Sequence, residues 1–180
     1  WVADAGALLG RLHASALAAD VPSTCSTRTW CDDANADLEI LCNAGKLTAA
    51  EAAALRAEIL RRDPETAGAA LVHTDFCAEN MLIDTRGCLR VIDNERLSIE
   101  PPGYDLGRTF DRWPMSAAAW QRFRGGYRSS APAEPQSIGF WKIVVALVGA
   151  RIRFKYTPAR LGASLVLLRR LAAGGDFVDA

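Results

Sequence analysis

The stretch that decides the fold is LVHTDFCAENMLID at residues 71–84, followed by LRVIDNE at residues 89–95. Apolar runs at both ends of the first segment and at the start of the second predict three short β-strands. The DTRG tetrapeptide between the last two strands suits a hairpin turn, because Gly87 accepts a positive φ at little cost. Polar residues directly follow the first and third strands, where loops held by rigid elements usually carry functional groups.

These polar residues form an H-x-D-x-x-x-x-N element from His73 through Asp75 to Asn80, and Asp93 ends the third strand. Phosphoryl transfer needs one carboxylate that orients the acceptor hydroxyl and accepts its proton. It also needs oxygen ligands for Mg²⁺, which bridges the nucleotide phosphates. Asp75 suits the first role, and Asn80 and Asp93 suit the second. A lone D-x-x-x-x-N is common by chance, so the prediction depends on the order and spacing of the whole set.

On both sides of this element the apolar residues recur at helical spacing. Residues 20–31 are predicted to form a loop, and a T-x-x-E capping box at Thr48 and Glu51 marks the start of a helix. The predicted fold class is mostly α with a small β-hairpin element (α+β). We expect a single domain over residues 1–180, divided into a helical subregion at 1–69, catalytic and metal loops at 70–112 and C-terminal helices at 113–180.

The segments LVHTDFCAENMLID, LRVIDNE and GYDLGRTF, the last at residues 103–110, resemble the catalytic segment of the aminoglycoside phosphotransferase and choline kinase-like superfamily. The similarity is dense over residues 71–110 and extends loosely back to LLGRLH at residues 8–13. The resemblance implies a protein-kinase-like fold. It also implies ATP- and Mg²⁺-dependent transfer of a γ-phosphoryl group to a hydroxyl of a small molecule such as an aminoglycoside or a choline-like alcohol.

The resemblance also implies roles for single residues. Asp75 is expected to be the catalytic base and His73 a support for the catalytic loop. Asn80 and Asp93 are expected to hold Mg²⁺ on the phosphates of ATP.

Further along the chain, Asp105 is expected to be a buried carboxylate that ties the catalytic loop to the next helix. Glu95 matches the choline kinase-like variant of the motif and is expected near the metal or the substrate. Two positions depart from the family pattern, since Thr74 stands where Gly is usual and Asn94 where an aromatic residue is common.

The resemblance further implies a part that is missing here, a β-rich N-terminal lobe with a Gly-rich loop and a nucleotide-anchoring lysine. No G-x-G-x-x-G precedes residue 70, and the first lysine is Lys46. We therefore expect the C-terminal lobe alone, with very low activity in isolation because this chemistry depends on positioning. The alternative is a catalytically incomplete binding or scaffold module. Apolar surface where the missing lobe would dock makes self-association an expectation.

The charge, apolar runs and cysteines of the chain limit the kinds of partner and the cellular compartment that we expect. The net charge is zero, yet residues 1–120 carry 11 basic against 18 acidic side chains, and residues 121–180 carry 10 against 3. Solvated helix faces explain this sorting better than an anionic partner does, so nucleic-acid binding is not expected. No apolar run is long enough to span a membrane. The five cysteines are odd in number and form no C-x-x-C pair. We expect a cytoplasmic protein with reduced thiols.

Two features of the C-terminal third bear on the acceptor. Basic residues are frequent there and either line the acceptor cleft, which favours an uncharged or anionic alcohol, or lie on a surface, which is the preferred interpretation. They are Arg122, Arg124, Arg128, Arg151, Arg153, Lys155 and Arg160. Aromatic residues at helical spacing either form a choline-type pocket or belong to the core, and the core is preferred. They are Trp113, Trp120, Phe123 and Trp141.

Overall fold

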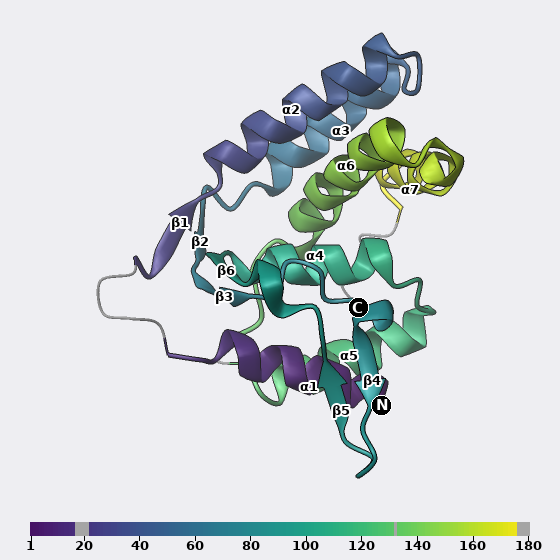
Figure 1. Ribbon diagram of the computed structural model, residues 1–180. Helices are drawn as coiled ribbons and strands as arrows, with labels where there is room; N and C mark the ends of the chain where they lie inside the picture. Colours follow the sequence, from purple (N-terminus) through teal and green to yellow (C-terminus); the bar gives the residue numbers. More distant parts are fainter. Residues whose placement is uncertain (17–21, 132, 176–180) are drawn as a thin grey trace. The chain divides into compact units, whose positions relative to one another are not determined.

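The computed structural model describes residues 1–16, 22–131 and 133–175. Most of these residues are helical, as the sequence predicts, and the strands are short (Figure 1). The chain divides into two compact units, which are Trp1–Cys25 with Ala67–Gln136 (unit 1) and Ser26–Thr66 with Ser137–Ala180 (unit 2). The three-part division made from the sequence follows chain order, whereas each unit combines two segments that are distant in the chain.

Unit 1 contains the proposed catalytic element. Its helices are α1 (Val2–His13), α4 (Pro102–Arg112) and α5 (Ala117–Arg128), with the short 3₁₀ turns η1 (Ala78–Asn80) and η2 (Asn94–Arg96). Its strands are β3 (Ala70–Val72), β4 (Met81–Ile83), β5 (Leu89–Val91) and β6 (Ser98–Glu100). Two more strands, β1 (Thr24–Ser26) and β2 (Thr66–Gly68), pair with each other.

The predicted hairpin is present. Strands β4 and β5 are antiparallel, with Met81 opposite Val91 and Ile83 opposite Leu89. The turn between them has Gly87 at a φ of 77°, the positive value for which glycine is suited. The hairpin therefore places the loop before β4 and the loop after β5 at the same end of one two-stranded ribbon.

Helices α1 and α5 lie side by side (Figure 1), and glycines let their backbones approach closely. A Cβ atom at Gly6 would overlap the main-chain oxygen of Phe123, and one at Gly126 would overlap that of Ala3. Because the two helices meet without intervening side chains, the position of α1 is fixed. Its last turn carries His13, which contacts Asp105 of α4.

Unit 2 consists of helices joined by short turns. They are α2 (Arg28–Asn43), α3 (Ala49–Arg62), α6 (Ile138–Tyr156), η3 (Pro158–Arg160) and α7 (Leu161–Ala172). The predicted capping box is confirmed, because the Glu51 N–H donates to the Thr48 hydroxyl at 3.2 Å and the Thr48 N–H donates to the Glu51 carboxylate at 2.7 Å. An ion pair of 2.5 Å between Asp37 and Arg151 joins α2 to α6.

The sequence-based loop at residues 20–31 is wrong in its second half, since α2 begins at Arg28. The cause is tertiary. The Thr27 hydroxyl donates to Asp63 Oδ1 at 2.5 Å and the Thr27 N–H donates to the Glu65 carbonyl at 3.1 Å, which fixes the residue before the helix. Residues 17–21, which include the start of this predicted loop, lie outside the described residues. No helix in the described ranges is both long and apolar enough to cross a membrane.

Candidate active site

The loop after β3 is held by one buried carboxylate. Asp105, in the first turn of α4, is fully buried. Its Oδ2 accepts the main-chain N–H of His73 at 2.7 Å, and its Oδ1 accepts that of Thr74 at 2.7 Å. Two charge-assisted hydrogen bonds to successive N–H groups fix the backbone immediately before Asp75. Asp105 therefore connects the loop after β3 to α4.

A second pair of side chains holds Asp105 from the other side. His13 Nε2 lies 3.1 Å from Asp105 Oδ2, and the Tyr127 hydroxyl donates to His13 Nδ1 at 2.8 Å. Burial raises the pKa of Tyr127, and the nearby charge of Asp105 raises it further, so the phenol stays protonated. The chain of contacts from α5 through α1 to α4 is buried throughout, so it positions the loop rigidly.

The departure at Thr74 has a structural cost. Its φ is 68°, in the left-handed region that a β-branched residue rarely adopts. The Thr74 hydroxyl donates to the Arg96 carbonyl at 3.2 Å, and its N–H is held by Asp105. These contacts keep a side chain where glycine would be free of strain, so the loop conformation is imposed by its surroundings.

His73 connects the two halves of the motif. Its ring Nε2 lies 3.2 Å from the main-chain oxygen of Ile92, and its Nδ1 accepts the Asp75 N–H at 3.3 Å. Both contacts fit the neutral tautomer with its proton on Nε2. The ring thus spans from the loop that carries Asp75 to the residue before Asp93, and it is 1% exposed. This is a supporting position, as the resemblance implies for His73.

Asp75 and Asn80 are directly linked. The Asn80 side-chain amide donates to the Asp75 main-chain oxygen at 2.9 Å and approaches Asp75 Oδ2 at 3.4 Å. The Ile92 N–H donates to the Asn80 main-chain oxygen at 2.9 Å. This bond extends the hairpin pairing by one step, so Asp93 follows a residue that is paired with Asn80. The structure therefore brings the proposed base and both proposed ligand positions together.

Asp93 and Glu95 lie on the exposed turn after β5. Asp93 has a φ of 63°, a left-handed conformation that Asp tolerates better than most residues. Glu95 follows in η2, is exposed, and has no recorded contact that connects it to the other site residues in the described ranges. The metal or substrate contact expected for Glu95 therefore stays a prediction.

The donor set fits a magnesium ion. Asn80 uses its amide nitrogen for Asp75, and within the described residues neither its side-chain oxygen nor the Asp93 carboxylate has a recorded partner. Mg²⁺ is usually bound by one or two carboxylates together with substrate phosphates and water. Among the described residues there is no cluster of three or more His, Cys, Asp or Glu that would form an all-protein metal cage.

Two arginines of α4 were missed by sequence reasoning. Arg108 Nε lies 3.2 Å and Arg112 Nη1 lies 3.3 Å from the same oxygen, Asp75 Oδ1. Arg112 also pairs with Glu79 at 2.5 Å. Burial lowers the pKa of Arg112, but the hydrogen bond to Glu79 and the charge of Asp75 outweigh it and raise the pKa overall. The spacing of Asp105, Arg108 and Arg112 on successive helical turns is the signal that could have found them.

Four of the seven basic residues noted in the C-terminal third take part in local pairs. In unit 1, Arg124 and Arg128 contact Glu134 at 2.6 Å and 2.7 Å. In unit 2, Arg151 pairs with Asp37, and Arg153 donates to the Ser164 hydroxyl at 2.7 Å. These contacts favour a structural role for the four arginines.

The aromatic residues belong to the core. In unit 1, Trp113, Trp120 and Phe123 are at most 9% exposed, and the rings of Trp120 and Phe123 stack at 5.5 Å. In unit 2, Trp141 is fully buried. This agrees with the preferred interpretation of the pattern, because buried stacked rings leave no open face for a cationic ligand.

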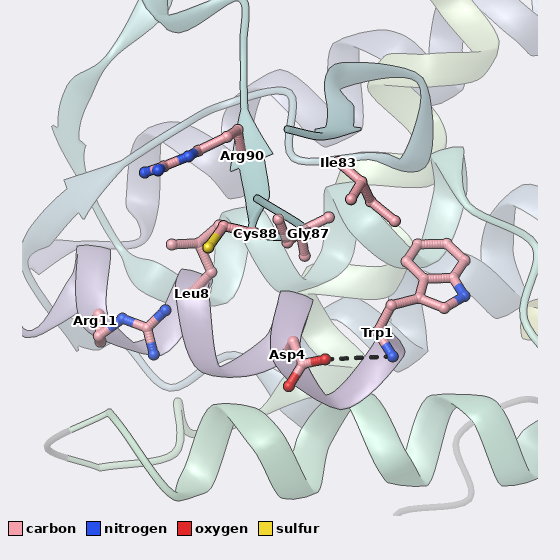
Figure 2. A pocket seen from close by; sticks show the side chains of 9 residues that line it. Trp1, Asp4, Leu8, Arg11, Ile83, Gly87, Cys88 and Arg90 are labelled. Carbon is pink, nitrogen blue, oxygen red and sulfur yellow. Dashed lines mark ion pairs between the residues drawn. The ribbon is translucent and has the colours of Figure 1, made fainter. Parts of the chain in front are cut away.

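A groove of about 570 Å³ separates α1 from the hairpin in unit 1. Figure 2 shows Asp4, Leu8 and Arg11 of α1 on one side and Cys88 and Arg90 of the hairpin on the other. An adjoining hollow of about 420 Å³ shares Leu8, Arg11 and Arg90 and extends to the ring of His73. The groove therefore approaches the catalytic loop from the side that faces α1.

Two comparisons with known proteins found a match. The model of the phosphotransferase enzyme family matches residues 1–138. A solved structure, a choline/ethanolamine kinase family protein from Mesorhizobium loti, is similar with a TM-score of 0.60 at 23% sequence identity. The similarity covers 96% of this chain and 64% of that protein, so the chain spans about two thirds of its length. No curated protein matches.

Proposed function

Because the chain belongs to the phosphotransferase enzyme family, we propose that it is the C-terminal lobe of an ATP- and Mg²⁺-dependent kinase that acts on a small molecule. The observation that carries the proposal is the direct link between Asp75 and Asn80, on a loop that His73 ties to Ile92, the residue before Asp93. A carboxylate beside two possible oxygen ligands for Mg²⁺ is the part of the phosphoryl-transfer machinery that this lobe would supply.

In this proposal each residue has one task. Asp75 accepts the proton of the acceptor hydroxyl as its oxygen attacks the γ-phosphorus. Asn80 and Asp93 offer oxygens to Mg²⁺, which when bound offsets the negative charge of the phosphates. Asp105 and His73 position the loop and take no part in the bond changes. The solved relative is longer than this chain, which supports the proposal that a further lobe holds the nucleotide.

The test uses the complete protein that contains this chain. Asp75→Asn removes the proton acceptor and should lower the turnover of ATP-dependent phosphoryl transfer by about a hundredfold or more. The readout is ADP release in the presence of an alcohol. Asp32→Asn, an exposed carboxylate on α2, is the matched control and should keep full turnover.

An unchanged turnover in Asp75→Asn would reject the proposed base. A complete protein that binds MgATP without any turnover would instead favour the scaffold alternative. Calorimetry with MgATP separates this case from a failure to bind the nucleotide.

A further inference from the structure

The face of α4 beside Asp75 carries two arginines, and the proposed catalytic roles leave these side chains unexplained. Arg108 and Arg112 both contact Asp75 Oδ1, at 3.2 Å and 3.3 Å. The side chain of Arg108 is only 11% exposed and lies 3.8 Å from Asp111 as well. Arg108 is therefore held on two sides within the helix surface, and its position is fixed.

Arg112 differs from Arg108 in its surroundings. Its side chain is 27% exposed, and its second partner, Glu79, is 64% exposed. An ion pair with so exposed a carboxylate contributes little, because water and salt screen it. A negatively charged ligand group can therefore replace Glu79 at the Arg112 guanidinium at little cost.

The place of Arg112 follows from the chemistry of the neighbouring carboxylate. A hydroxyl that gives its proton to Asp75 lies within hydrogen-bond distance of that carboxylate. The Arg112 guanidinium is itself 3.3 Å from Oδ1 of the same group. A substituent one or two bonds away from the reacting hydroxyl is then within reach of Arg112 by a small change of its side-chain torsions.

We propose that Arg112 binds the acceptor, and that the acceptor is a small alcohol with a carboxylate or phosphate group close to its reacting hydroxyl. This inference rests on the proposed function and adds the substrate class. A guanidinium presents paired N–H donors that match both carboxylate and phosphate oxygens. A polycationic aminoglycoside or a quaternary ammonium alcohol would meet Arg108 and Arg112 with charge of the same sign.

The acceptor oxygen forms a bond to the γ-phosphorus, the bond from that phosphorus to the β,γ-bridging oxygen breaks, and ADP leaves. The acceptor proton passes to Asp75, which becomes neutral. Arg108 and Arg112 then lose the charge of Asp75, and the anionic group of the acceptor supplies a replacement beside Arg112.

The test compares three alcohols of similar size in the complete protein: glycerate with a negative charge, glycerol with none, and choline with a positive charge. We expect kcat/KM to be highest for glycerate. Arg112→Gln should raise the KM for glycerate about tenfold or more, because it removes a hydrogen bond between charged groups. It should leave the KM for glycerol nearly unchanged. Arg112→Glu should reverse the preference toward choline.

Arg122→Gln, which removes an exposed arginine on α5, is the control and should keep the wild-type order of acceptors. An equal or lower kcat/KM for glycerate than for choline in the wild type, including no transfer to glycerate, would overturn the inference. So would an equal loss of kcat with all three acceptors in Arg112→Gln, which would mean that Arg112 only positions Asp75. Absence of Asp75-dependent ADP release would instead reject the proposed function.

Discussion

The substitution Asp105→Asn tests how the catalytic loop is held. Asp105 accepts hydrogen bonds from the N–H groups of His73 and Thr74 and lies 3.1 Å from the ring of His13. Asparagine has the same shape but only one acceptor oxygen. If that oxygen keeps the contacts of Oδ2, the new NH₂ group faces the Thr74 N–H, and two donors oppose each other in a fully buried site.

The magnitude follows from these contacts. A buried N–H without an acceptor costs about 1–3 kcal/mol. The hydrogen bonds that remain lose their charge assistance, which removes about 1 kcal/mol from each. We therefore expect Asp105→Asn to lower the free energy of unfolding by about 3–5 kcal/mol, in the range found when one partner of a buried charged pair is removed.

Urea unfolding followed by tryptophan fluorescence measures the free energy, since Trp113 and Trp120 lie in the same unit. Hydrogen exchange at the Thr74 amide reports the loop itself, and this amide should lose its protection. Asp4→Asn, on an exposed side chain of α1, is the control and should change the free energy by less than about 0.5 kcal/mol. A loss below about 1 kcal/mol, or an unchanged exchange rate at Thr74, would refute the role assigned to Asp105.

Two further predictions concern packing and pH. Gly126→Ala should destabilise unit 1 by about 3 kcal/mol in urea unfolding, because the new Cβ would overlap the main-chain oxygen of Ala3. A Cβ at Gly125 meets nothing within 4 Å, so Gly125→Ala should stabilise the unit by up to ~1 kcal/mol. Burial raises the pKa of the Asp37 carboxyl despite the nearby Arg151. The contribution of this carboxyl to the stability of the fold is therefore present below the unfolded pKa of 3.8 and is lost as the pH rises through the folded pKa. The stability of Asp37→Asn relative to the wild type should therefore increase from about pH 4 to about pH 7. The same difference in urea midpoint between variant and wild type at both pH values would contradict this.

Much of the fold follows from local pattern. The capping box at Thr48 and Glu51, the turn at Gly87 and the strands around the motif are visible in the sequence because each depends on residues within a few positions. Strand β6 was not predicted. Its three residues carry no distinct pattern, and they form a strand only because they pair with β3, with Leu71 opposite Ile99.

The residues of the candidate site also divide into those that the sequence reveals and those that only tertiary contacts reveal. Asp75, Asn80 and Asp93 are found from order and spacing, since one loop and one hairpin carry all three. Arg108 and Arg112 were not found, because they lie 33 and 37 residues after Asp75 in the chain. Helical periodicity indicates which residues share a face of a helix, but not which other segment of the chain packs against that face.

By itself the sequence determined the family and the mostly helical class, and it led to the residues proposed for phosphoryl transfer, because these depend on short motifs and local periods. Only the tertiary structure decided what surrounds them. It placed His13 against Asp105, held Thr74 in a left-handed conformation and set two guanidinium groups on the proposed base. Charge and burial at a site are sums over residues that are distant in the chain, and no local pattern contains that sum.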